Sequence, residues 1–79
     1  MPISVLFFGS TAEIAGQRQI EVQLLDKLTA GDVFEQLLAD FPRLAARQLR
    51  YSVNHQYARG DEIIRDGDEL AIFTAVSGG

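Results

Sequence analysis

Cysteine and tryptophan are absent from this 79-residue chain, and histidine occurs only once. The lack of thiols excludes disulfide bonds, thiolate zinc sites and a cysteine nucleophile, and it is typical of a protein kept in a reducing compartment. No stretch approaches the roughly 18 apolar residues of a membrane-spanning helix, and the N-terminus shows no signal-peptide pattern. We therefore expect a cytoplasmic protein that does not enter a membrane.

Basic residues are also scarce, because seven of them stand against eleven acidic residues and give a formal net charge of −4. Sequence-independent binding to nucleic acid needs lysine and arginine against phosphates, so we expect no nucleic-acid partner. Two groups of charged side chains are expected to be solvated. They are Asp61, Glu62, Asp66, Asp68 and Glu69 in the acidic group, and Arg43, Arg47 and Arg50 in the basic group.

What the chain does contain is a succession of short apolar segments. Hydrophobic residues make up 47% of the sequence, enough for one core, and 79 residues leave no room for a second. The β-branched and aromatic residues 3–8 predict a buried strand, and the alternation in residues 18–24 predicts a second strand close enough to form a hairpin with it. Residues 9–16 predict a turn or a short helical segment.

The middle of the chain predicts one main helix. Thr29 can cap its first turn, and Asp32 stands where negative charge is favoured. Val33, Leu37 and Phe41 recur at helical spacing, and the proline at position 42 ends the helix. Residues 43–50 are less regular and predict at most a second short helical turn.

Further strands are predicted at residues 51–54, briefly through Tyr57, and at residues 69–73 after the turn Asp66-Gly67-Asp68. This order of elements predicts an α+β fold, in which a mixed sheet of four to five strands packs on one main helix. The first and last strands would lie side by side and parallel. We expect a single domain over residues 1–79, in which residues 74–79 form a flexible C-terminal tail.

The sequence ends in Ser77-Gly78-Gly79. Two glycines without Cβ atoms make a thin thread that a narrow channel in another protein can admit, and glycine tolerates backbone conformations closed to other residues. We therefore expect this end of the chain, rather than a cleft in the domain, to be the functional site.

The sequence resembles the ubiquitin-like β-grasp sulfur carriers, and most closely the small subunits of molybdopterin synthase within that family. The likeness spans nearly the whole chain and depends on four segments in a fixed order. They are Val5-Leu6-Phe7-Phe8-Gly9 with Glu13 and Gly16 behind it, Val53-Asn54, Asp66-Gly67-Asp68-Glu69-Leu70-Ala71-Ile72-Phe73, and Val76-Ser77-Gly78-Gly79. The chain departs from the family at Thr74 and Ala75, where prolines are usual, and at Ala12, where an arginine often precedes the glutamate.

This resemblance implies a protein that is not an enzyme on its own. In the family, an E1-like adenylating enzyme uses ATP to activate the terminal glycine carboxylate, and sulfur transfer then yields a thiocarboxylate. The large subunit of molybdopterin synthase takes up the tail and passes the sulfur to a pterin precursor. By this resemblance Gly79 carries the sulfur, while Gly78, Ser77 and Val76 thread the channel. It implies no permanently bound cofactor and no metal site.

The alternation within the two central strands predicts a partner-binding surface. If Val5 and Leu70 face the core, then Phe8 and Phe73 point outward from neighbouring strands. The resemblance adds Tyr57 as a third apolar position on this face. In the family, the equivalent face binds both the adenylating enzyme and the large subunit of molybdopterin synthase. Exposed apolar patches of this kind commonly mark interaction sites.

Other functions remain open at this stage. A related β-grasp carrier for thiamine, cysteine or tungsten-cofactor synthesis would share these features. A ubiquitin-like modifier would instead join Gly79 to lysines through isopeptide bonds, and in a plain binding module the glycines would be incidental. Catalysis by His55 is disfavoured, because a solitary histidine at a turn is usually a surface residue. Asp66 and Asp68 fall short of a calcium loop and are expected to form a turn.

Overall fold

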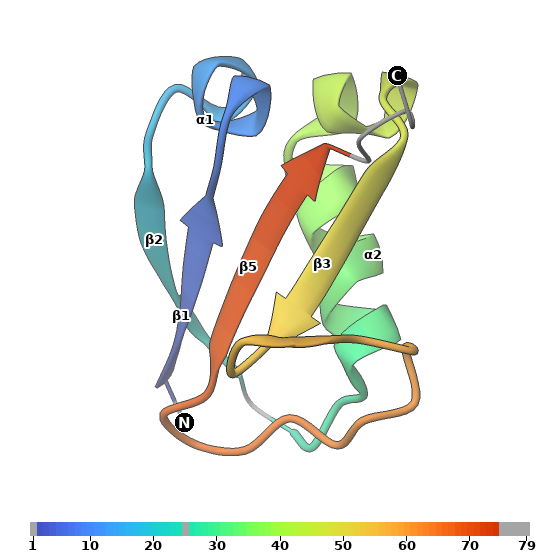
Figure 1. Ribbon diagram of the computed structural model, residues 1–79. Coiled ribbons are helices and arrows are strands. Elements are labelled where there is room, and N and C mark those ends of the chain that lie inside the picture. The colour runs from blue at the N-terminus through green and yellow to red at the C-terminus, as the bar shows by residue number, and fades with distance from the viewer. Residues whose placement is uncertain (1, 25, 75–79) are drawn as a thin grey trace.

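A five-stranded mixed sheet with one long helix across one face forms the domain (Figure 1). The computed structural model describes residues 2–24 and 26–74. Its elements are β1 (Pro2–Phe7), α1 (Ser10–Ala15), β2 (Gln19–Gln23), α2 (Ala30–Asp40), the 3-10 helix η1 (Pro42–Ala46), β3 (Leu49–Val53), β4 (Gln56–Tyr57) and β5 (Glu69–Thr74). The strand order is β2-β1-β5-β3-β4, which confirms the predicted α+β β-grasp architecture.

The first and last strands lie in parallel at the centre of the sheet. Their pairing runs from Ser4 opposite Glu69 to Phe7 opposite Ile72. The flanking strands β2 and β3 pair antiparallel with β1 and β5 respectively. A parallel pair needs a long crossover connection, and here the whole middle of the chain, including α2, supplies it.

Helix α2 begins where the sequence predicts, because Thr29 and Asp32 cap it reciprocally. The Asp32 backbone N–H donates to Thr29 Oγ1, and the Thr29 N–H donates to Asp32 Oδ2, both at 3.2 Å. Aspartate thus completes the capping box in place of the usual glutamate or glutamine. The helix ends at Asp40, and the irregular segment that follows forms η1 before β3 begins.

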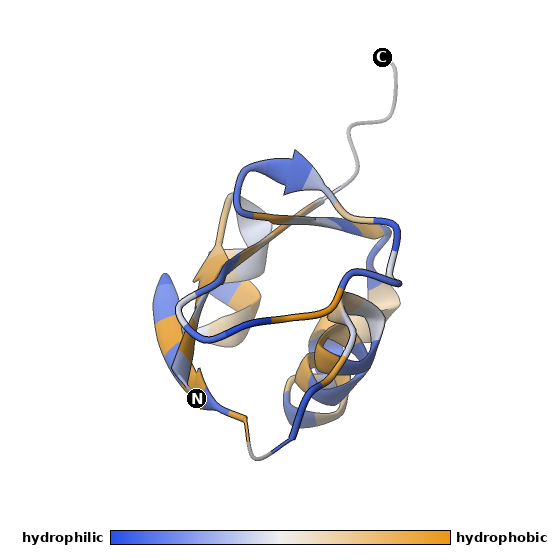
Figure 2. Ribbon diagram, turned by 90° about the horizontal axis from the view of Figure 1, so that it is seen from below, coloured by the Kyte–Doolittle hydropathy of each residue, from blue (hydrophilic) through white to orange (hydrophobic). Residues whose placement is uncertain are grey.

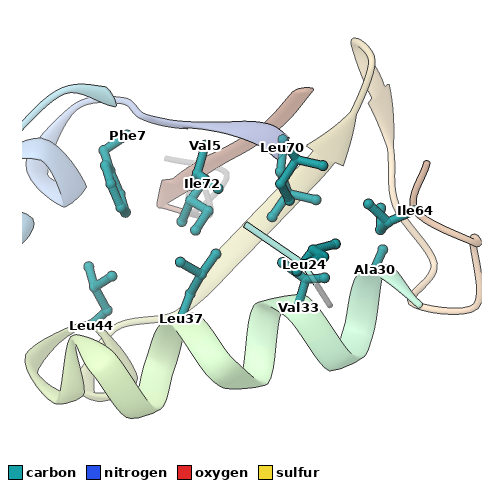
Figure 3. Packing of buried hydrophobic residues seen from close by; sticks show 11 residues of the cluster. Val5, Phe7, Leu24, Ala30, Val33, Leu37, Leu44, Ile64, Leu70 and Ile72 are labelled. Carbon is teal, nitrogen blue, oxygen red and sulfur yellow. The ribbon is translucent and has the colours of Figure 1, made fainter. Parts of the chain in front are cut away.

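The core lies between the sheet and α2, with residues from both layers pointing toward one another (Figure 3). Alternate residues of the central strands and the apolar stripe of the helix supply it. Its buried members are Ile3, Val5, Phe7, Leu24, Ala30, Val33, Leu37, Leu44, Ile64, Leu70 and Ile72. Phe41 is only partly buried and packs edge-on against Phe7, while Phe34 stacks on Tyr51 at 4.3 Å between ring centroids. The last contact ties the helix to β3.

The last described residue belongs to the sheet. Thr74, the first residue of the predicted tail, is the final residue of β5 and pairs with Leu49. The rest of that tail, residues 75–79, lies outside the described residues. Within residues 2–24 and 26–74, no helix has the length and apolar character needed to cross a membrane.

The loop between β4 and β5 is organised by Glu62. Its carboxylate accepts hydrogen bonds from the backbone N–H groups of Arg59 at 2.7 Å and Gly60 at 2.8 Å. The N–H groups of Arg59, of Glu62 itself and of Gly60 hold the pKa of the Glu62 carboxyl below its ordinary value. The carbonyl oxygens of Glu62 and Gly60 accept from the N–H groups of Ala30 and Gly31 at 2.7 and 2.9 Å. One carboxylate therefore shapes the loop that satisfies the first turn of α2.

We expect Glu62→Gln to reduce the pH dependence of folding stability in acid. Because the folded-state pKa is lower than the unfolded one, the carboxylate stabilises the fold above the unfolded pKa. That stabilisation is lost as the pH falls through the folded pKa. The variant should be less stable than the parent in urea unfolding at neutral pH, and the two should converge at low pH. The control is Asp61→Asn, which removes the same charge next door; an equal effect of both substitutions would contradict this account.

Candidate functional site: the outward face of the sheet

The face of the sheet opposite α2 carries the three aromatic residues that the sequence singles out. Phe8 is 51% exposed and Tyr57 is 74% exposed, whereas Phe73 is half-buried. The rings of Tyr57 and Phe73 meet edge-on with centroids 5.8 Å apart. All three border one hollow, which Ser52, His55, Glu69 and Ala71 also line. We call this surface the aromatic face.

Strand register explains why these side chains gather. Leu6 stands opposite Ala71, Ala71 opposite Ser52, and Ser52 opposite Tyr57, so one row crosses four strands on the outward side. Phe73 lies two residues beyond Ala71 on the same side of β5. Helix α2 packs on the other, core-facing side of the sheet and lies behind it in Figure 1.

The turn after β1 fixes the position of Phe8. Its backbone N–H donates to the carbonyl of Ile72 at 2.9 Å, which extends the pairing with β5 by one step. Gly9 follows with φ of 60° and ψ of −137°, a conformation that strains any residue with a Cβ, so the chain turns sharply there. Phe8 is therefore left outside the core.

Thr11 is the one described polar residue that is fully buried, and sequence reasoning did not find it. Its hydroxyl lies 2.5 Å from the carbonyl oxygen of Phe8 and 3.1 Å from that of Ile72. The hydroxyl thereby links α1 to the end of β5 beneath the aromatic face. A polar residue that packs into the core through one long-range hydrogen bond leaves no periodic signal in the sequence.

His55 is part of a tight turn at the rim of the aromatic face. Asn54 and His55 connect β3 to β4 with positive φ angles of 50° and 72°, the two-residue geometry of a type I′ hairpin. Asn54 donates to Asp68 Oδ1 and accepts from the Glu69 N–H, each at 3.0 Å. His55 Nε2 lies 3.8 Å from Glu69 Oε2, and its side chain is 85% exposed. These contacts assign His55 to the turn.

The predicted turn at Asp66-Gly67-Asp68 is present, and Asp68 Oδ2 accepts the Arg65 N–H at 2.7 Å. The carboxylate of Asp68 is thus used for the turn and for Asn54. Over residues 2–24 and 26–74, no group of three or more histidine, cysteine, aspartate or glutamate side chains is arranged to hold a metal ion.

The tail residues of the predicted site, Val76, Ser77, Gly78 and Gly79, lie outside the described residues. The structure describes the chain as far as Thr74, the last residue of β5. β5 carries the chain along the aromatic face, past Phe73, to the end of the sheet beside η1 (Figure 1).

A model of the ThiS family matches residues 5–79. The chain belongs to the ThiS family. Among curated relatives, the molybdopterin synthase sulfur carrier subunit of Chlamydomonas reinhardtii is 34% identical, and the match covers all of both chains. Small archaeal modifier protein 1 of Haloferax volcanii is 33% identical over 91% of this chain and 94% of its own. The crystal structure of that modifier protein superposes with a TM-score of 0.84 and 29% identity over the full length of both chains.

These similarities confirm the ubiquitin-like β-grasp family that the sequence motifs indicate. Relatives named as sulfur carriers and as modifiers are about equally similar to this ThiS-family chain. The family assignment therefore identifies the chain as a β-grasp sulfur carrier or modifier, and it does not distinguish between these two roles.

Replacing Thr11 tests the link beneath the aromatic face. Thr11→Val keeps the shape of the side chain and removes the hydroxyl, and we expect the free energy of unfolding to fall by about 1 kcal/mol. The loss stays moderate because the Phe8 and Ile72 carbonyls each keep a backbone N–H donor. Thr74→Val is the matched control, since its hydroxyl has no hydrogen-bond partner among the described residues. Chemical denaturation of both variants should rank Thr11→Val clearly lower; equal stability would show that the buried hydroxyl contributes nothing.

Proposed function

We propose that this chain is the sulfur-carrier small subunit of a molybdopterin synthase. The observation that carries the proposal is the similarity to a molybdopterin synthase sulfur carrier subunit over the full length of both chains, a match that extends through Gly78 and Gly79 of this chain. In this role the domain is no catalyst by itself. It presents its terminal carboxylate to enzymes that supply every acid, base and nucleophile.

The proposed chemistry is confined to Gly79. A carboxylate is a poor electrophile, so an oxygen of Gly79 first attacks the α-phosphorus of ATP on an E1-like adenylating enzyme, and pyrophosphate leaves. Hydrosulfide, or another donor that gives up sulfur at the sulfide oxidation level, then attacks the acyl carbon and displaces AMP, so a C–S bond replaces the acyl C–O bond to AMP and Gly79 becomes a thiocarboxylate. On the large subunit of molybdopterin synthase, that sulfur bonds to the pterin precursor, and water then cleaves the acyl C–S bond, which restores the Gly79 carboxylate and leaves the sulfur on the precursor that becomes the dithiolene. Gly78 keeps the thread narrow enough to reach both active centres.

The aromatic face is the proposed docking surface for both partners. Phe8 is 51% exposed and Tyr57 is 74% exposed, and Phe73 stands next to the last residue of β5. A partner that covers these rings is thereby aligned with the start of the tail. Large aromatic side chains that become desolvated at an interface supply much of its binding free energy.

A second candidate is a ubiquitin-like modifier, and the nearly equal similarity to small archaeal modifier protein 1 favours keeping it. Here a lysine ε-amine would attack the activated carbonyl of Gly79 and form an isopeptide bond. Mass spectrometry of the protein from its own cells separates the two. A carrier shows the mass gain of one oxygen replaced by sulfur, whereas a modifier appears on lysines of other proteins.

We expect Phe73→Ala to weaken binding to the adenylating enzyme about 30-fold or more, which corresponds to about 2 kcal/mol. Because the ring is only partly buried within the domain, the free energy of unfolding should fall by about 1 kcal/mol. Calorimetric titration and urea unfolding measure the two effects on the same protein. Val22→Ala removes a partly buried apolar side chain that packs against the core from β2 and does not line the hollow of the aromatic face, and it should leave affinity nearly unchanged. Similar losses in binding and folding for Phe73→Ala would argue against a docking role.

Adding one alanine after Gly79 should abolish sulfur loading. The new terminal carboxylate would be displaced from the reacting position, and catalysis depends on atomic placement. Loading is followed by intact-mass spectrometry with the adenylating enzyme, ATP and a sulfur donor. The same alanine added before Met1 should have no effect. Normal loading of the extended carrier would refute activation at Gly79.

A further inference from the structure

Charged side chains are distributed unequally between the two ends of the sheet. The end where β5 begins is bounded by loops that Figure 2, seen from below, colours largely hydrophilic. Seven acidic residues occupy these loops and the adjoining ends of α2 and β5, with three basic ones. They are Asp26, Asp32, Asp61, Glu62, Asp66, Asp68 and Glu69, with Lys27, Arg59 and Arg65.

The opposite end, where β5 finishes, has the reverse balance. Its basic residues lie on η1, on the segment after it, on β3 and beside the end of β1. They are Arg43, Arg47, Arg50 and Arg18, against Glu13 of α1 and Asp40 of α2. A chain with a net charge of −4 therefore presents a positive end at the site from which the tail departs.

Three of these arginines lie on β3, which pairs with the end of β5, or in the residues just before it. Leu49 pairs with Thr74, and Arg50 pairs with Phe73, so the segment that contains Arg47 and Arg50 runs alongside the last residues of β5. Arg43 lies in the adjoining 3-10 helix, and all three side chains are exposed. In the described part of the chain, none of the three guanidinium groups lies within 4.0 Å of a carboxylate. We call these residues the arginine ridge.

We propose that Arg43, Arg47 and Arg50 dock against carboxylates that surround the tail entrance of the adenylating enzyme. The proposal rests on the proposed function, because any protein that takes up the tail must cover the end where β5 finishes. It extends the aromatic face, since Arg50 stands opposite Phe73 on the outward side of the sheet. Arginine suits the role because its planar guanidinium pairs with carboxylates in bidentate geometry.

The charge distribution favours a protein surface over a free phosphate. The three arginines lie on η1, on the segment after it and on β3, and none of them lines the hollows beside Phe8 and Tyr57. An acidic partner would repel most of this acidic domain and attract only the arginine ridge. Such opposed charges orient the approach and raise the association rate, an effect that salt weakens.

The test compares two triple reversals with the same net charge. R43E/R47E/R50E inverts the arginine ridge, whereas K27E/R59E/R65E inverts the basic residues at the other end. R43Q/R47Q/R50Q is a milder version in case the reversal disturbs folding. The second-order rate constant for Gly79 loading by the adenylating enzyme from the same genome is measured at low and high salt, with binding of ATP alone to the free carrier measured separately.

We expect the ridge reversal to lower that rate constant about tenfold or more at low salt and to flatten its salt dependence. The other reversal should change it less than about threefold. Saturating enzyme should still load the ridge variants, because their tail is intact. Equal losses in both reversals would overturn the proposal. It would also be overturned if the free carrier bound ATP and R43Q/R47Q/R50Q abolished that binding, because the arginines would then serve a phosphate and not a protein surface. If the unaltered carrier is never loaded, both the proposed function and the docking proposal are wrong. If it is loaded normally and the ridge reversal leaves the rate constant unchanged, only the docking proposal is wrong.

Discussion

The parallel pairing of β1 with β5 is the constraint on which the other features of the domain depend. It brings the two ends of the described chain to the middle of the sheet, so β1 and β5 each have a neighbouring strand on both sides. In the same step it divides their side chains between a core face and an outward face. Val5 and Ile72 fall on one side, and Leu6 and Phe73 on the other.

Secondary contacts then hold the exit of β5 in place. The Thr11 hydroxyl reaches the carbonyl of Ile72 from α1, and Asn54 binds the Glu69 backbone at the opposite end of the strand. The strand that leads to the tail is thus fixed at both ends and along both edges. The aromatic face that borders this strand is therefore held in one arrangement by contacts from α1, β1 and β3.

Much of this was readable from the sequence, and the exceptions share a physical cause. The buried strands, the capped helix at Thr29 and the outward position of Phe8 follow from local periodicity and capping chemistry. β3 starts two residues earlier than predicted, because Leu49 pairs with Thr74 of β5, which is 25 positions away in the sequence. Arg50 was expected to be merely solvated, and its place beside Phe73 emerges only from that same pairing. Local patterns do not encode long-range register.

The two outermost strands determine how copies of this protein behave toward one another. β4 has only two residues, too few to offer a template of free backbone groups. β2 alternates its half-buried Ile20 and Val22 with exposed Gln19, Glu21 and Gln23, which place a charge in the middle of the other open border. Sheets whose borders are short or charged resist joining edge to edge. Such borders disfavour strand pairing between copies of the domain, which leaves the broad surface of the sheet as its main area for contact with other proteins.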